Sequence, residues 1–290
     1  MYRVTVVIPA LNEAANLPHV LPRIPRSVHE VILVDGASTD GTVEVARALW
    51  PGARVIQQGG PGKGSAVRTG FAAATGEIVV MLDADGSNDP GEISRLVDAL
   101  LRGADLAKGS RFLPGAGTSD MPLHRKFGNG VLVGIVNLLF DTRFTDLCYG
   151  YMAFWKRDLA SLALDATGFE IESQLILRAR RAGLRVAETP SFEARRIHGS
   201  GNLRTIPDGW RVLKQILKER LWTPVATVDV RIPVMAHDED SIAVHPPETQ
   251  PNPSAAFLGS DAWFPATARQ PHHVETDEDG LAVPGSQLSR

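Results

Sequence analysis

Two aspartates one residue apart, Asp83 and Asp85, follow directly on the apolar residues 78–82. Such a run is typical of a strand buried on both faces of a parallel sheet, and its end lies where open α/β sheets bind ligands. Two carboxylates this close repel each other unless a cation neutralises them, and their hard oxygens suit Mg²⁺ or Mn²⁺. The pattern therefore indicates a metal site that holds a diphosphate. The alternative is an Asx-rich turn that ends at Gly86.

The elements that must position these aspartates show a repeating order. Three apolar runs come before them, and each is followed by a polar or glycine-rich turn and a stretch with helical spacing: residues 4–9, 31–34 and 54–56. This order predicts an α/β fold with a parallel sheet, in which the turns gather at one edge. The turn around Lys63 is not a P-loop, because Gly64 follows the lysine where Ser or Thr would stand. No Gly-x-Gly-x-x-Gly follows the first strand, which argues against a dinucleotide-binding oxidoreductase.

In their order along the chain, these motifs resemble glycosyltransferase family 2, most closely the branch of dolichol- and polyprenyl-phosphate sugar synthases. The matching segments are residues 8–13, 34–42, 62–64, 81–85, 108–112, 145–151, 168–172 and 195–199. The resemblance implies the GT-A fold of nucleotide-diphospho-sugar transferases, a Rossmann-like sandwich with a mainly parallel sheet.

The resemblance also implies a nucleotide-sugar site assembled from these motifs: Pro9, Ala10, Asn12, Glu13, Asp35, Lys63, Asp83, Ala84, Arg111, Arg196 and His198. Asp85 is implied as the direct metal ligand, and Asp83 as a residue near the sugar or ribose that also serves the metal. The carboxylate of Asp35 can accept a hydrogen bond from a base N–H, and Lys63 can pair with a phosphate. The alternatives are a turn-starting aspartate and a solvated loop lysine.

Late basic residues are implied as a lid over the diphosphate: Arg195, Arg196 and His198. The planar guanidinium of arginine matches phosphate geometry. The chain departs from the familiar pattern at Asn202, where relatives often carry lysine, so one lid contact is in doubt. The alternative is a solvated basic loop.

Attack by the acceptor on the face opposite a nucleoside diphosphate leaving group inverts the anomeric centre. A hydroxyl acceptor needs a general base, whereas a phosphate acceptor is already ionised. Glu170 and Glu172 are the candidate bases, and Asp146 is a candidate for orienting the acceptor. The two glutamates are equally suited to the start of a helix, where they would complement its dipole.

Composition limits the remaining possibilities. The chain has 290 residues, a net charge of −3 and one cysteine, Cys148, which excludes intrachain disulfides and gives no zinc pattern. No apolar run reaches the roughly 18 residues of a membrane span, and the N-terminus enters a core strand without a secretory signal. Residues 130–140 are the longest apolar stretch, which we expect to be a core or interface helix. We expect a cytoplasmic protein with no nucleic-acid partner.

The sequence divides after Trp222. Residues 1–222 should form the catalytic domain, closed by an amphipathic helix over 208–222 that Asp208 caps. That helix could lie at a membrane interface or pack on the core. Residues 223–290 hold ten acidic and three basic residues and many prolines, so we expect a mostly disordered tail.

The function expected from these observations is metal-dependent, inverting transfer of a hexose from a UDP-, GDP- or TDP-sugar. Polyprenyl phosphate is the favoured acceptor, with peripheral contact at the cytoplasmic face of the membrane left open. One alternative is transfer to the hydroxyl of a soluble small molecule or natural product. The other is a nucleotide-sugar binding protein without turnover.

Overall fold

A central sheet of seven strands organises the protein, which we describe from a computed structural model at residues 2–201 and 203–224. The expected disordered tail and Asn202 therefore lie outside the described residues, apart from Thr223 and Pro224. The spatial order of the strands is β3-β2-β1-β4-β7-β5-β8. Their bounds are β1 Val4–Ala10, β2 Glu30–Asp35, β3 Arg54–Gln57, β4 Ile78–Met81, β5 Leu106–Ser110, β7 Met152–Trp155 and β8 Val186–Pro190.

The sheet is mainly parallel, as the sequence predicts. Only β7 runs against its neighbours β4 and β5. The carboxyl ends of β1, β2, β4, β5 and β8 therefore meet at one edge, and the residues that precede β7 reach the same edge. A separate pair of short parallel strands, β6 Gly117–Thr118 and β9 Phe192–Glu193, also lies in segments that leave this edge.

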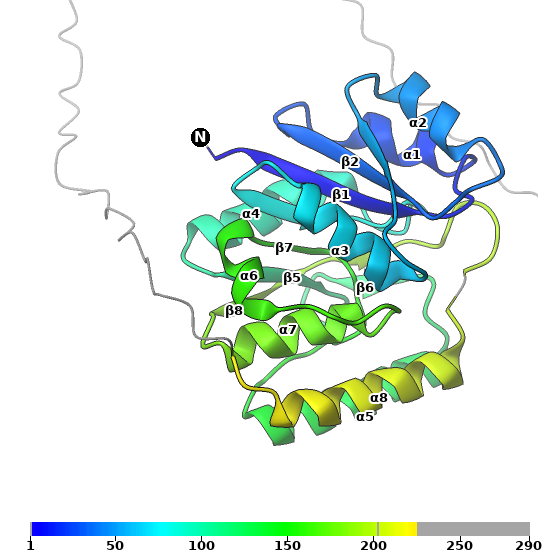
Figure 1. Cartoon of the computed structure of the whole chain (residues 1–290). Helices are drawn as coiled ribbons and strands as arrows, with labels where there is room; N and C mark the ends of the chain where they lie inside the picture. The colour runs from blue at the N-terminus through cyan, green and yellow to red at the C-terminus, as the bar shows by residue number, and fades with distance from the viewer. Residues whose placement is uncertain (1, 202, 225–290) are drawn as a thin grey trace, which may run out of the picture. The chain divides into compact units, whose positions relative to one another are not determined.

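Helices cover both faces of the sheet (Figure 1). Their bounds are α1 Leu17–Val20, α2 Thr42–Leu49, α3 Lys63–Ala73, α4 Ile93–Leu101, α5 Leu123–Phe140, α6 Leu159–Leu162, α7 Ile171–Arg181 and α8 Thr205–Leu221. Single 3₁₀ turns occupy Leu21–Arg23, Pro90–Glu92 and Lys156–Asp158. Side chains of α1, α2 and α4 pack on one face, and those of α3, α5, α6, α7 and α8 pack on the other.

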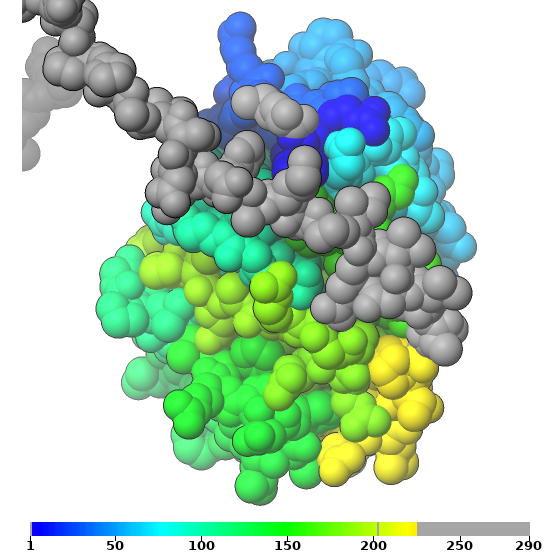
Figure 2. Space-filling view, turned by 90° about the vertical axis from the view of Figure 1, so that its left-hand side faces the viewer, coloured from blue at the N-terminus to red at the C-terminus, as the bar shows by residue number. Residues whose placement is uncertain are grey.

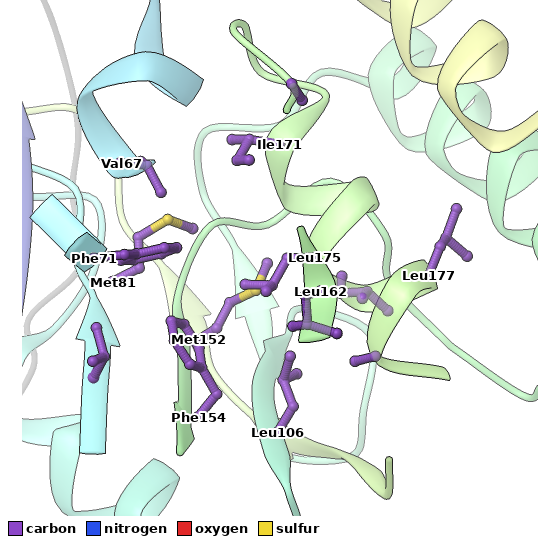
Figure 3. Close-up of a cluster of buried hydrophobic side chains, with 14 of the residues drawn as sticks. Val67, Phe71, Met81, Leu106, Met152, Phe154, Leu162, Ile171, Leu175 and Leu177 are labelled. Atoms are coloured by element: carbon purple, nitrogen blue, oxygen red, sulfur yellow. The ribbon is translucent and has the colours of Figure 1, made fainter. Parts of the chain in front are cut away.

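The core follows from the alternation of side chains along the strands. In β4, Val79 and Met81 face the α3–α7 side, whereas Ile78 and Val80 face the α4 side. Figure 3 shows the cluster of buried side chains on the α3–α7 side of the sheet, where side chains from α3 and α7 meet those of β4, β5 and β7. Each large apolar side chain buried there contributes about 1.5–3 kcal/mol to stability.

Two helices differ from the expected bounds. The apolar stretch from residue 130 belongs to the longer helix α5, and the helix expected from Asp208 begins at Thr205. Asp208 is not the cap: it lies in the first turn, and its carboxylate accepts a hydrogen bond from the Arg204 backbone N–H at 2.7 Å. The α8 residues lie at the molecular surface, in yellow in Figure 2. Among the described helices, none is long and apolar enough to cross a lipid bilayer.

Candidate functional site

A cavity of about 870 Å³ opens at the carboxyl edge of the sheet. Its wall includes Pro9 and Ala10 at the end of β1, and Asp83, Ala84 and Asp85 after β4. The opposite wall comes from α5 and α8. The cavity therefore joins the two aspartates to helices that are distant in sequence.

Lys63 lies between two carboxylates of this cavity. Its Nζ is 2.7 Å from Asp83 Oδ1 and 2.8 Å from Glu172 Oε1. Burial would lower the pKa of Lys63, but the two carboxylates outweigh it and raise that pKa. Burial raises the pKa of Glu172, although Lys63 opposes the change. Lys63 is therefore a fixed, protonated cation beside Asp83, which does not fit a solvated loop lysine.

Glycines on either side of Lys63 allow this arrangement. A Cβ on Gly62 would lie 2.4 Å from the carbonyl oxygen of Thr167, and one on Gly64 would lie 2.5 Å from that of Ala166. Gly62 also has a φ of +88°, which favours glycine. The close approach brings the segment that carries Glu172 onto the start of α3.

Arg196 links the second aspartate to the segment that follows β1. Its Nη2 lies 2.6 Å from Glu13 Oε2, and its Nη1 lies 3.4 Å from Asp85 Oδ2. The neighbouring Ile197 donates its backbone N–H to the carbonyl of Asp85 at 3.2 Å, and its side chain covers Gly86. Burial raises the pKa of Glu13, while Arg196 opposes the change. The segment around Arg196 thus lies over the Asp-x-Asp turn, and its role as a lid over a diphosphate stays a prediction.

The turn interpretation of the aspartates also holds. Asp85 Oδ1 accepts from the backbone N–H of Ser87 at 3.0 Å, which is an Asx turn, while Oδ2 faces Arg196. The Asx turn uses one oxygen of Asp85, and the residue still lines the cavity. The two interpretations are therefore compatible at the same residue.

Arg111 and Asp146 form a buried pair rather than two free groups. Arg111 Nε and Nη2 donate to the two oxygens of Asp146 at 2.6 and 2.8 Å, and Asp146 is 0% exposed. Burial would raise the pKa of Asp146, but Arg111 and Lys108 hold it below its ordinary value. Both oxygens of Asp146 are bound to Arg111, and Asp146 does not line the cavity; its role in orienting the acceptor stays a prediction. Arg111 itself lines the cavity and also pairs with Glu193.

Two residues expected at the nucleotide are held by local turns. Asp35 is 2% exposed, accepts from the backbone of Ala37 and Ser38 and from Gln57 Nε2, and does not line the cavity. The role of Asp35 in hydrogen-bonding a base stays a prediction. Asn12 accepts from the Thr39 backbone N–H at 2.9 Å.

Asn12 and His198 line an adjoining hollow of about 210 Å³. This hollow shares Leu11, Arg196, Gly199 and Ser200 with the larger cavity, so Asn12 and His198 lie beside the main site rather than in it.

The two candidate bases differ in position. Glu172 lines the cavity, whereas Glu170 does not. Glu170 is at the N-cap position of α7, and its Oε1 accepts from the backbone N–H of Gly168 at 3.0 Å. Glu172 lies in the first turn of α7, so both also occupy the helix start that was the alternative.

A hydrogen-bonded network of Asn88 and Tyr149 supports the backbone at Asp83, and the sequence did not predict it. The side-chain oxygen of Asn88 accepts from the Asp83 backbone N–H at 3.1 Å, and its Nδ2 donates to the Tyr149 hydroxyl at 3.0 Å. The Tyr149 ring in turn lies 4.8 Å from the Arg111 guanidinium. Asn88 is close to Asp83 in sequence, and Tyr149 is inside a matching motif, but neither type signals chemistry alone.

The cavity also carries basic side chains away from the two aspartates. His124, Arg125 and Arg195 line it, and Arg125 Nη2 donates to the Leu203 carbonyl at 3.3 Å. Cys148 also lines the cavity, and burial raises the pKa of its thiol to about 12, so it stays protonated. These groups suit an anion and do not supply a thiolate nucleophile.

Comparison with known proteins identifies the family. The model for glycosyl transferase family 2 matches residues 5–162. A dolichol-phosphate mannosyltransferase of Pyrococcus furiosus is 30% identical over 74% of this chain and 64% of its own length. A polyprenol monophosphomannose synthase of Mycolicibacterium smegmatis is 34% identical over 65% of this chain and 76% of its own length. The chain thus spans just under two thirds of the archaeal relative.

A solved structure shares the architecture. Glucosyl-3-phosphoglycerate synthase from Mycobacterium tuberculosis, in complex with Mn²⁺, UDP and glucosyl-3-phosphoglycerate, has a TM-score of 0.59 and 28% identity. The match covers 75% of this chain and 80% of that one. The fold is GT-A-like, and the chain belongs to glycosyltransferase family 2.

Proposed function

We propose that this glycosyltransferase moves a hexose from a nucleoside diphosphate sugar to a polyprenyl phosphate, with inversion at the anomeric carbon. The observation that carries the choice of acceptor is the ion pair between Glu172 and Lys63 at 2.8 Å. A hydroxyl acceptor requires a base to remove its proton, and Glu172 is the candidate base that lines the cavity. A carboxylate held by a protonated lysine is a poor base, whereas a phosphate acceptor needs none.

Most other carboxylates of the cavity are similarly engaged. Among the described residues that line it, Glu13 and Asp85 face Arg196, Asp83 faces Lys63, and Glu193 faces Arg111. Asp208 accepts from the Arg204 backbone, and Asp120 is exposed. Arg125, Arg195 and His124 would attract the phosphate of the acceptor.

A divalent cation fits the residues after β4. Among the described residues, no group of three or more His, Cys, Asp or Glu side chains could hold a metal. Mg²⁺ in proteins is often bound through one or two carboxylates together with substrate phosphates, and Asp85 and Asp83 offer that ligand type. A bound metal would offset the charge that develops on the diphosphate as it leaves. Solved relatives bind Mn²⁺ or Mg²⁺ with UDP.

The residues of this chain have separate roles in the transfer. An acceptor phosphate oxygen forms a bond to the anomeric carbon as the bond from that carbon to the diphosphate oxygen breaks, and the bonding electrons leave with the diphosphate. Lys63 and Arg196 supply positive charge near the leaving group. Asn88 and Tyr149 fix the turn that carries Asp83. The acceptor lipid would bring the protein to the cytoplasmic face of a membrane by reversible, peripheral contact.

A second function has its own supporting observation. Burial raises the pKa of Glu172, which would suit a general base, and the solved relative carries a glycosylated phosphoglycerate. Transfer to the hydroxyl of a small phosphorylated acid is therefore the alternative.

The two functions separate in one experiment. Purified protein is given UDP-, GDP- and TDP-sugars with Mn²⁺, together with either a polyprenyl phosphate or phosphoglycerate, and product is measured for wild type and Glu172→Gln. Transfer to the lipid phosphate with less than about a tenfold loss in the variant supports the proposal. Transfer to the hydroxyl alone, with a loss of roughly 10²–10⁴-fold in the variant, would establish the alternative. Exposed Glu44→Gln on α2 is the control.

A further inference from the structure

A continuous chain of hydrogen bonds runs from the turn after β4 to the residue before α4. The side-chain oxygen of Asn88 accepts from the Asp83 backbone N–H at 3.1 Å, and Asn88 Nδ2 lies 3.0 Å from the Tyr149 hydroxyl. That hydroxyl lies 2.9 Å from Ser191 Oγ, which in turn donates to Glu92 Oε2. We call Asn88, Tyr149, Ser191 and Glu92 the Glu92 chain. Its first three members are 1%, 3% and 2% exposed, so water does not replace these bonds.

Each hydrogen bond of the Glu92 chain has a fixed direction. The amide nitrogen of Asn88 can only donate, so the Tyr149 oxygen accepts from it and the Tyr149 proton goes to Ser191. Ser191 then gives its own proton to Glu92, whose ionised carboxylate only accepts. Burial raises the pKa of Tyr149 above its ordinary value, so the hydroxyl keeps the proton that it donates. The carboxylate at one end therefore sets the orientation of the amide at the other.

Glu92 receives hydrogen bonds on both of its oxygens. Oε2 accepts from Ser191, while Oε1 lies 3.4 Å from the backbone nitrogen of Phe192 and 3.4 Å from Arg95 Nη1. Hydrogen bonds to an ionised acceptor are roughly twice as strong as those between neutral groups. The carboxylate is therefore a firm end point for the chain.

Strand β5 leaves room for the Glu92 chain by carrying a glycine. A Cβ on Gly109 would lie 2.7 Å from the Tyr149 ring and 3.0 Å from Ser191 Cβ. The backbone N–H of Ser191 donates to the carbonyl of Ser110, the next residue of β5, at 3.0 Å. A larger residue at position 109 would therefore push apart the two hydroxyl-bearing side chains that meet there.

The Glu92 chain meets the cavity at two places. Its Asn88 end holds the backbone of Asp83, one of the two aspartates proposed to serve the metal. The Tyr149 ring lies 4.8 Å from the Arg111 guanidinium, which also lines the cavity. The other three members of the chain do not line the cavity. The chain therefore joins a carboxylate outside the site to the backbone inside it.

We propose that Glu92 is a positioning residue for donor binding, because the Glu92 chain fixes the turn that presents Asp83 and Asp85 to the metal and the diphosphate. The inference rests on the proposed function for the donor and the metal, and it does not depend on which acceptor is used. Glu92 itself touches no reacting group.

An amide at position 92 cannot replace the carboxylate. In Glu92→Gln, the amide oxygen can accept from Ser191 only if the NH₂ group faces the Phe192 N–H, which is also a donor. If the NH₂ group faces Ser191 instead, each bond of the chain reverses, and the Asn88 amide turns its own NH₂ group toward the Asp83 N–H. Either arrangement sets donor against donor, and the second does so at the aspartate turn.

The role is tested by calorimetric titration of UDP, GDP and TDP, each with Mn²⁺. Glu92→Gln and Tyr149→Phe should each raise the dissociation constant of the nucleotide and the Mn²⁺ concentration for half-maximal binding, by roughly 10–100-fold. Tyr151→Phe is the matched control, because Tyr151 is also fully buried and its hydroxyl donates to the Asp89 carbonyl at 2.7 Å, outside the Glu92 chain. It should lower the melting temperature as Tyr149→Phe does, but bind nucleotide and Mn²⁺ as wild type does.

A double variant separates positioning from a general loss of stability. If Glu92 acts through Tyr149, Glu92→Gln with Tyr149→Phe should bind nucleotide no more weakly than the weaker single variant. Losses that multiply in this double variant, or a dissociation constant of Glu92→Gln equal to that of wild type, overturn the positioning role. If Glu92→Gln does not fold, Ser191→Ala takes its place in the same comparison, because it removes the same link.

Failure of the proposed donor site would give a different result. Wild type that binds none of the three nucleotides with Mn²⁺ contradicts the proposed donor site, and with it the positioning role. Wild type that binds one of them, with Glu92→Gln and Tyr149→Phe equal to Tyr151→Phe, contradicts the positioning role and leaves the donor site in place.

Discussion

The two ends of the cavity are built from opposite kinds of side chain. At the carboxyl ends of β1 and β4, each charged group is held by a partner from a distant segment, as Lys63 is by Glu172 and Arg196 is by Glu13. Between α5 and α8 the wall includes glycine, leucine and valine beside the polar side chains of His124, Arg125 and Asp208, and both helices carry exposed apolar side chains on their outer sides.

This difference follows from what each end must bind. A diphosphate concentrates charge, so a site for it needs fixed charges whose positions do not change as the reaction proceeds. An apolar chain offers no directional contact, so a site for it needs space and surface rather than partners. Three predictions, each sensitive to one end, test this division.

The largest effect is expected at the charged end. Asp85→Asn should lower the rate of sugar transfer by about 10³-fold, equivalent to about 4 kcal/mol of transition-state stabilisation, because it removes a carboxylate placed for a cation. The measurement is initial rate with saturating donor and Mn²⁺, with the melting temperature as a check on folding. Asp98→Asn on the exposed side of α4 is the control and should equal wild type. If Asp85→Asn keeps nearly wild-type activity, and keeps it in excess chelator, the reaction does not depend on a metal at the charged end.

An intermediate effect, on stability, is expected where α8 packs on α7. Arg178→Met should reduce the free energy of unfolding by about 3 kcal/mol, because it leaves the fully buried carboxylate of Glu219 without its cation. The check is the urea unfolding midpoint. Arg180→Met, at an exposed position of the same helix, should cost under about 0.5 kcal/mol. Equal midpoints for the two variants would show that α8 is held by its apolar contacts alone.

The strand ends of the charged end were predictable from the sequence because they lie in short segments after apolar runs. The apolar run before Asp83 indicates a strand that ends at the sheet edge, and β4 ends there. Side-chain partners were not predictable. Asp146 was the candidate for orienting the acceptor, and its pairing with Arg111 depends on how the start of β7 and the end of β5 meet across the sheet.

The apolar end was predictable only in part. Helical spacing in α8 was visible, and so was the apolar character of α5. That the two helices share a cavity wall depends on their packing, which no local pattern encodes. Gly128 of α5 and Gly209 of α8 line the cavity, but the sequence did not predict this. A glycine inside a helical pattern indicates nothing about the space beside it.

The smallest effect distinguishes the two ends by their response to acid. Burial raises the pKa of Glu13 and Glu172 at the charged end above the ordinary value of 4.5. Under the apolar end, burial would raise the pKa of Asp165, but Lys218, Gln174 and Arg178 hold it below its ordinary value of 3.8.

The signs of these shifts are opposite. The folded state takes up protons on Glu13 and Glu172 more readily than the unfolded chain does, so acidification through their folded pKa values favours the folded charged end. Asp165 contributes stability above its ordinary value, and that contribution is lost as the pH falls through its folded pKa. Acid should therefore weaken the attachment of α8 before it weakens the ends of β1 and β4.

Hydrogen exchange of protein without added metal or donor gives the measurement. Protection of the α8 amides should fall below about pH 4, while protection of β1 and β4 is kept. Asp165→Asn should show reduced α8 protection at neutral pH, with the difference from wild type disappearing as the pH falls through the folded pKa of Asp165, because the wild-type carboxylate is then protonated as well. Asp120→Asn, at the exposed rim of the cavity, should follow wild type throughout. The contrary result is that β1 and α8 lose protection together in wild type, at a pH that Asp165→Asn does not alter. The two ends would then unfold as one unit, and they would differ only in the ligands that they bind.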